Sequence, residues 1–264
     1  MYVKITLEQE KEIIQLIETK SQGEIAKIFN VSQSAISKLM KRYGVKKNNK
    51  GRLNMARLPL DVDYFKYINS NDKAYWLGYI CGDGNINKDY KVTITTKDLQ
   101  IVERFKNDIK SGHTIGYSSY HDDRTDKVYS RYTIQIRNYI FVNNIIDKGV
   151  TIDKTDYLLF PKIDEKYYSY FIAGIFDSDG HVGSIGKKRV SLISTFEILK
   201  FISDYLYKEL NIKELRFSKV SENKDNVYKL HLYKDSTKFL DFIYGDKDFK
   251  YMSRKYKIFL DKYK

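Results

Sequence analysis

The chain has 264 residues, 42% of them hydrophobic and 15% aromatic, so it can bury a substantial core and is long enough for two domains. Its formal net charge of +13 favours a polyanionic partner, and no apolar run approaches the roughly 18 residues of a membrane span. The single cysteine, Cys81, excludes an intramolecular disulfide and a cysteine-rich zinc site, and it fits a reducing cytoplasm, where we expect the protein to act.

Residues 1–45 predict a small helical domain. Thr6 can cap a first helix that extends to about residue 19, and Gln9, three residues later, completes a capping box. Ser21 begins a second, shorter helix, and Ser32 can cap a third. The expected domain is therefore all-α.

The second and third helices have a diagnostic spacing. Counting from Gln22, the small Ala26 falls where two helices would cross closely, and Asn30 falls where the turn needs the left-handed region. Ile36 and Leu39 would face back into the core. The pattern resembles the helix-turn-helix family, with asparagine where glycine is usual. A generic three-helix interaction module is the alternative.

The charge distribution favours the helix-turn-helix interpretation. Residues 32–52 contain seven Lys or Arg and no Asp or Glu, and residues 46–64 are expected to be a basic linker. The third helix would place Gln33, Ser34, Ser37 and Lys38 against base edges or phosphates in the major groove. Backbone contacts are expected from Lys41, Arg42, Lys46, Lys47, Lys50 and Arg52.

An internal duplication organises the rest of the chain. Residues 75–84 and 171–180 superpose with a constant shift (179 − 83 = 96), which places Gly78 on Gly174, Asp83 on Asp179 and Gly84 on Gly180. After the first copy we expect strands at 84–86 and 92–96, a helix at 98–110, strands at 114–120 and 128–137, and a helix at 138–148. After the second copy we expect strands at 181–185 and 190–194, a helix at 196–210, strands at 215–220 and 227–233, and a helix at 236–244.

These patterns predict an α+β fold with a duplicated αββαββα unit and pseudo-twofold symmetry, divided into repeats 65–155 and 156–264. Each motif helix carries small residues four apart, which lets two helix backbones approach closely. These residues are Gly78 and Gly82 in the first copy, and Gly174 and Ser178 in the second.

Packing of the two motif helices would bring Asp83 and Asp179 together at their C-terminal ends. Two carboxylates at helix C-termini repel each other and the exposed carbonyls, and a shared divalent cation removes that conflict. Gly84 and Gly180 are expected to end the helices in the left-handed conformation. A turn formed by an ordinary Asp-Gly dipeptide is the alternative for either copy alone.

Both copies resemble the LAGLIDADG signature. The second copy matches it at Ala173, Gly174, Asp177, Asp179 and Gly180. The first copy matches it at Gly78, Ile80, Asp83 and Gly84, with Cys81 in place of the earlier aspartate.

The resemblance implies a monomer whose two sheets form a saddle over double-stranded DNA. It also implies Mg²⁺ (or Mn²⁺) at the helix junction, held by Asp83 and Asp179 with the adjacent Gly82 and Ser178. Lys154 and Lys255 look like the basic residues that the family places beside the catalytic carboxylates, whereas Asp177 is expected to support the helix junction.

The alternating residues Arg131, Thr133, Gln135 and Arg137 are candidates for contacts with DNA, although the sequence leaves open which face they occupy. The four histidines do not form a metal-ligand spacing. We therefore expect a site-specific double-strand DNA endonuclease with a long, asymmetric target. The alternatives are a catalytically inactive DNA-binding regulator of the same fold and, with less support, an RNA-binding intron maturase.

Overall fold

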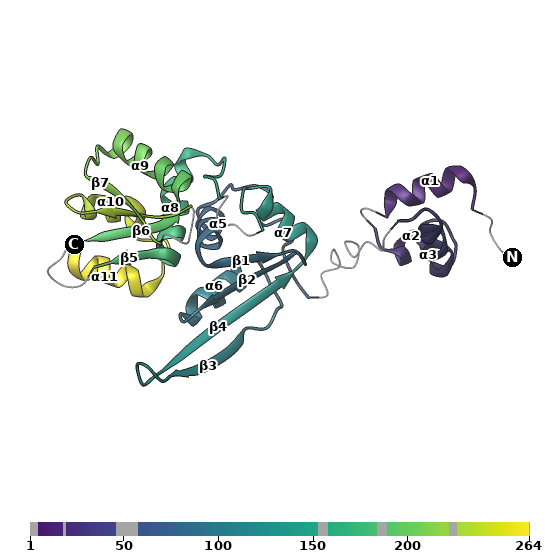
Figure 1. The fold of residues 1–264 in the computed structure, drawn as a ribbon, viewed down its shortest axis with the longest axis horizontal. Coiled ribbons are helices and arrows are strands. Elements are labelled where there is room, and N and C mark those ends of the chain that lie inside the picture. The colour runs from purple at the N-terminus through teal and green to yellow at the C-terminus, as the bar shows by residue number, and fades with distance from the viewer. Residues whose placement is uncertain are drawn as a thin grey trace.

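The computed structural model describes residues 5–17, 20–45, 58–152, 158–183, 189–221 and 226–263 (Figure 1). Buried side chains of these residues form two separate hydrophobic cores. The smaller core belongs to an N-terminal helical bundle, and the larger one extends through both repeats. Among the described residues, no helix is both long and apolar enough to cross a membrane.

The N-terminal bundle consists of α1 (Leu7–Leu16), α2 (Gln22–Ile28) and α3 (Gln33–Arg42). Thr6, Ser21 and Ser32 cap these helices, and the first two caps are complete capping boxes. Asn30 has φ = 50°, so the predicted left-handed position in the turn between α2 and α3 is confirmed. Whether this bundle binds DNA stays a prediction.

The first repeat has the expected order of elements. It contains α5 (Asn71–Asp83), β1 (Gly84–Asn87), β2 (Lys91–Thr96), α6 (Leu99–Asp108), β3 (Gly116–Asp122), β4 (Lys127–Arg137) and α7 (Tyr139–Ile146). Its antiparallel sheet has the strand order β1-β2-β4-β3. The β3–β4 hairpin extends past the end of β2, where Thr96 pairs with Tyr132, and projects from the body (Figure 1).

The second repeat follows the same plan. A short 3₁₀ helix, η1 (Glu165–Tyr167), precedes α8 (Tyr168–Asp179), β5 (Gly180–Val182), β6 (Val190–Thr195), α9 (Phe196–Leu210), β7 (Leu215–Lys219), β8 (Val227–Leu232) and α10 (Ser236–Tyr244). Its sheet has the matching order β5-β6-β8-β7. The predicted α+β duplication is therefore confirmed. A further helix, α11 (Ser253–Tyr263), was not predicted, and its N-terminal end contacts the first repeat, where the Ser253 hydroxyl donates to Gln100 Oε1 at 2.9 Å.

The motif helices α5 and α8 pack against each other at the centre of the larger core. A Cβ atom at Gly78 would collide with the backbone carbonyl of Phe171, and one at Gly174 would collide with that of Tyr75. Only a residue without a side chain allows the two backbones to come this close. The duplicated glycines therefore set the distance between the repeats.

The strands have one buried and one outward face. In β4, Ile134 and Ile136 are fully buried, whereas Arg131, Gln135 and Arg137 are exposed. Successive strand residues point to opposite faces, so the predicted contact residues share the face that is turned away from the core. Residues 58–64, the described end of the expected linker, pack onto the first repeat: Pro59 accepts a hydrogen bond from Gly112, and Tyr64 is buried.

Candidate active site

The ends of α5 and α8 bring the two predicted catalytic aspartates to one place. Asp83 is the last residue of α5 and Asp179 is the last residue of α8. Gly82 lies directly against the end of α8, because a Cβ atom built on it would be 2.9 Å from Asp179 Oδ2 and would overlap Ser178. The Tyr79 hydroxyl donates to Asp83 Oδ2 at 3.3 Å. The two helix ends therefore converge as predicted.

One detail of these helix ends was predicted wrongly. Gly84 (φ = −72°, ψ = 140°) and Gly180 (φ = −83°, ψ = 153°) are extended rather than left-handed, because each is the first residue of a strand. Glycine is required for a different reason, since a Cβ atom at Gly84 would lie 2.6 Å from the Ile80 carbonyl oxygen. The direct step from helix to strand therefore points the chain away from the junction immediately after each aspartate.

Asp177 is buried between the repeats and joins three parts of the chain. It accepts hydrogen bonds from the hydroxyl of Tyr75 on α5 (2.7 Å), from the hydroxyl of Tyr244 on α10, and from the backbone N–H of Met252 (2.8 Å). Burial raises the pKa of Asp177, although these hydrogen bonds oppose the shift. The pseudo-equivalent position in α5 is Cys81, so the two motif helices carry different side chains at this position.

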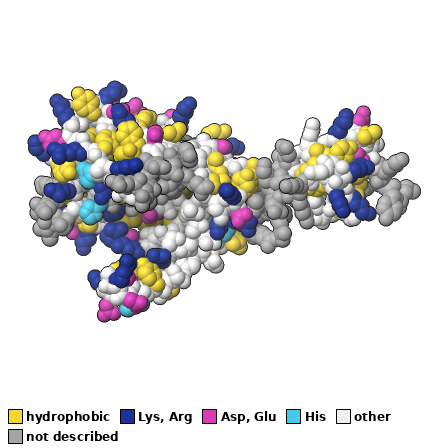
Figure 2. Space-filling model, in the orientation of Figure 1, with side chains coloured by type: hydrophobic (Ala, Val, Ile, Leu, Met, Phe, Trp, Pro, Cys, Tyr) yellow, Lys and Arg dark blue, Asp and Glu magenta, His cyan; other side chains and the backbone are white. Residues whose placement is uncertain are grey.

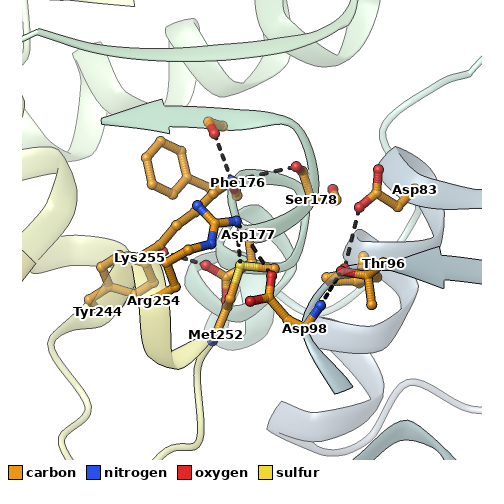
Figure 3. A network of polar contacts seen from close by, with 12 residues as sticks. Asp83, Thr96, Asp98, Phe176, Asp177, Ser178, Tyr244, Met252, Arg254 and Lys255 are labelled. Carbon is orange, nitrogen blue, oxygen red and sulfur yellow. Dashed lines mark hydrogen bonds and ion pairs between the residues drawn. The ribbon is translucent and has the colours of Figure 1, made fainter. Parts of the chain in front are cut away.

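Lys255, from the first turn of α11, caps the C-terminal end of α8. Its ammonium donates to the backbone carbonyls of Phe176 and Gly180, both at 2.6 Å, and lies 3.4 Å from that of Ser178. A cation at a helix C-terminus neutralises the exposed carbonyl dipoles. Burial lowers the pKa of Lys255 to about 8, and the carboxylates of Asp177, Asp83 and Asp179 oppose that shift. Figure 3 shows Asp83, Ser178, Arg254 and Lys255 gathered around the two helix ends.

A hollow of about 310 Å³ opens in front of the junction. Asp83 and Ser178 line it from the helix ends, and Arg254 lines it from the C-terminal segment. The side chains of Tyr120 and Arg131 line it from the β3–β4 hairpin, where Arg131 lies 4.5 Å over the Tyr120 ring and donates to its hydroxyl. The hollow thus combines carboxylates with guanidinium groups.

The remaining predicted site residues belong either to the N-terminal bundle or to segments outside the described residues. In the bundle, Gln33, Ser34, Ser37, Lys38, Lys41 and Arg42 are exposed, and Arg42 also pairs with Glu10. Lys154, Lys46, Lys47, Lys50 and Arg52 lie outside the described residues. No described contact connects the bundle residues to the helix junction.

Sequence reasoning missed the outward face of the second sheet. Arg216 is exposed there, and Lys229 and His231 are half-buried on the same face. In residues 229–232, the polar Lys229 and His231 alternate with the buried Leu230 and Leu232, and this alternation is the signal that could have found them. Figure 2 shows Lys and Arg side chains on the visible face of the bundle and of both repeats, not gathered in a single patch.

The two aspartates at the junction fit a hard divalent cation whose remaining ligands come from waters or a substrate. Asp83 and Asp179 supply two carboxylates, and within the described ranges no cluster of three or more His, Cys, Asp or Glu could hold a metal ion. Mg²⁺ is commonly bound by one or two carboxylates together with substrate phosphate oxygens and waters. The two aspartates therefore match a magnesium site that a nucleic-acid phosphate completes.

No protein-family model matches the chain, and no curated protein sequence matches it. Among solved structures, the homing endonuclease I-WcaI bound to its DNA recognition sequence is 14% identical, with a TM-score of 0.51 over 79% of this chain and 97% of that one. Two further matches score lower. The N-terminal LAGLIDADG domain of WhiA is 15% identical (TM-score 0.45; 75% of this chain and 93% of that one), and I-DmoI in complex with DNA and Ca is 18% identical (TM-score 0.41; 69% and 90%).

The duplicated αββαββα unit, the helix pair at its centre and the likeness to I-WcaI agree. This chain has the LAGLIDADG homing endonuclease fold.

Proposed function

We propose that the protein is a site-specific double-strand DNA endonuclease that acts as a monomer on a long, asymmetric target. The observation that carries the proposal is the pair of aspartates, one from each repeat, at the adjoining ends of α5 and α8. A structural role alone would not require two carboxylates at helix C-termini, where the helix dipoles disfavour them. A carboxylate pair that can bind divalent cations is well suited to hydrolysis of a phosphodiester in each strand.

In this proposal, Asp83 and Asp179 hold Mg²⁺, which would supply positive charge to the scissile phosphate and activate the attacking water. Lys255 has a positioning role, because its ammonium holds the carbonyls of the last turn of α8 and so orients Asp179. Asp177 holds the backbone N–H of Met252, and in this way it places Arg254 and Lys255 beside the junction. The guanidinium of Arg254 lines the hollow and could contact a phosphate there.

DNA is the partner that the outward surfaces favour. The outward face of β4 carries Lys127, Arg131 and Arg137, the second sheet carries Arg216 and Lys229, and the net charge is +13. I-WcaI, which has the same fold, is bound to a DNA recognition sequence in its structure. The N-terminal bundle, with exposed Lys38 and Lys41 on α3, would extend the contact with a helix-turn-helix domain.

The test begins with selection of bound duplexes from a random DNA library in Ca²⁺, followed by incubation of the selected duplex with Mg²⁺ or Mn²⁺. The unaltered protein should cut both strands. Asp83→Asn and Asp179→Asn should each abolish cutting while they retain binding, because amide groups are poor ligands for a hard cation. Asp204→Asn is the matched control, since Asp204 is exposed on α9 and pairs only with Lys200 among the described contacts.

Two results would contradict the proposal. Unchanged cleavage by either junction variant would remove the active-site assignment. Selective binding without cleavage in any divalent cation would favour a DNA-binding regulator instead. The observation that favours this second candidate is the engagement of Lys255 with backbone carbonyls of α8, which uses the buried ammonium as a helix cap.

A further inference from the structure

The strand register places one matched row of side chains on each sheet, a single residue after the motif glycine. In the first sheet, Asn85 pairs with Thr93, which pairs with Gln135. In the second sheet, His181 pairs with Ser191, which pairs with His231, and His231 pairs with Arg216 on β7. Because Asn85 follows Gly84 as His181 follows Gly180, the two rows are pseudo-symmetric about the helix junction.

Both rows point away from the core. Asn85, Gln135, His181 and Arg216 are exposed, Thr93 and His231 are half-buried, and Ser191 in the middle of the second row is buried. The residues on either side of each row point the other way. In the first sheet Val92, Ile94, Ile134 and Ile136 are buried, and in the second Val190, Leu230 and Leu232 are buried. Under the proposed function, these outward faces lie on the DNA, and each row would face one short step of a half-site.

The two rows differ in chemistry and in length, because His231 is the counterpart of Gln135 and Arg216 on the edge strand β7 has no counterpart in the first row. The first row ends in the carboxamides of Asn85 and Gln135, each of which has one acceptor oxygen and two N–H donors. A carboxamide can accept from adenine N6 and donate to adenine N7 in the major groove. This pair of contacts distinguishes A·T from G·C at the base that the row faces.

The second row has donors and no carboxamide. Tyr233, the residue after β8, orients Arg216: the guanidinium carbon lies 5.8 Å from the ring centroid, and Arg189 lies over the same ring at 5.7 Å. The Ser218 hydroxyl lies 2.8 Å from His231 Nε2, and this hydrogen bond orients the imidazole. A guanidinium donates two parallel hydrogen bonds to O6 and N7 of guanine, which is the commonest specific contact in the major groove.

We propose that the row containing Gln135 reads an A·T pair in one half-site and that the row containing Arg216, which extends one strand further, reads a G·C pair in the other half-site. The two half-sites of the target then differ even though the protein fold is nearly twofold. The inference rests on the proposed DNA-binding function, and it assigns specificity to residues that do not belong to the helix junction.

The experiment measures competition binding in Ca²⁺ between the selected duplex and duplexes that differ from it at single base pairs. Arg216→Gln should change the preference at one position from G·C toward A·T, and Gln135→Arg should change the preference at one position of the other half-site from A·T toward G·C. A good bidentate contact corresponds to a discrimination of roughly 5- to 150-fold at the affected position. All other positions should keep their preferences.

Lys208→Gln is the matched control, because it removes one positive charge from α9, which packs on the opposite, core-facing side of the second sheet. A uniform loss of affinity for all duplexes in Arg216→Gln would overturn the assignment, since it would identify a phosphate contact. Unchanged preferences in both row variants would also overturn it, while DNA binding itself would stand. Failure of the unaltered protein to select any duplex would overturn the proposed function along with the row assignment.

Discussion

The contact between α5 and α8 makes Gly78 a sensitive position. In Gly78→Ala, the new methyl group would occupy the place of the Phe171 carbonyl, so the two helices would have to separate. Overpacking of this kind costs about 1–3 kcal/mol, and the upper part of that range applies because the obstacle is backbone in a buried helix rather than the end of a flexible side chain. The lower entropy of the unfolded alanine chain offsets about 0.4–1 kcal/mol.

The expected net loss in the free energy of unfolding is therefore about 2 kcal/mol. For a body of about 200 residues this corresponds to a decrease in Tm of about 4–8 °C. Urea and thermal unfolding can be followed by the fluorescence of Trp76, the single tryptophan of the chain, which is fully buried on α5 itself. The signal reports on the helix pair and not on the N-terminal bundle.

The pseudo-symmetric variant Gly174→Ala should show a loss of the same sign, because its methyl group would meet the Tyr75 carbonyl. Gly116→Ala is the control in the same body: its Cβ atom would lie 3.6 Å from the Thr133 carbonyl oxygen, an ordinary contact. Separation of the helices should also displace Asp83 from Asp179 and reduce cleavage. If Gly78→Ala unfolded at the same midpoint as the unaltered protein, the close approach of the helices could not be the reason for glycine there.

Two further predictions concern other parts of the chain. The pKa of Lys255 is lowered to about 8 by burial, so between pH 8 and its ordinary value the unfolded chain binds more protons and stability rises with pH. Lys255→Met should remove that rise when urea unfolding in EDTA is compared across this range, and an unchanged slope would contradict the assignment. Ile36→Ala should cost about 2–4 kcal/mol and unfold the small N-terminal bundle, because Ile36 is fully buried in its separate core. The far-UV circular dichroism should then lose helix while the Trp76 unfolding midpoint stays unchanged.

Local patterns in the sequence were sufficient for the order of the elements. Thr6, Ser21 and Ser32 cap helices by contacts with residues three positions away, and Asn30 occupies the left-handed turn that its spacing predicted. The duplicated motif also determined that Asp83 and Asp179 are equivalent, because both follow helices with small residues at the same intervals. Such features depend on backbone groups within a few residues, which the sequence itself specifies.

Long-range contacts decided the rest. The sequence did not predict α11, whose N-terminal turn places Lys255 on the last carbonyls of α8 and Ser253 against the first repeat. It also assigned Gly84 to the left-handed region, whereas the following strand makes that glycine extended.

The strand faces also show which features the sequence predicts and which ones depend on packing. The alternation of Arg131, Gln135 and Arg137 predicted a shared face, but only the packing of Ile134 and Ile136 against the core turned that face outward. A periodicity of two separates the side chains of a strand into two sets without saying which set is buried. In this protein the sequence by itself determined the order of the elements up to α10 and the pair of aspartates. The tertiary structure decided which side chains surround those aspartates and which ones face outward, because burial is set by contacts between segments that lie far apart in the chain.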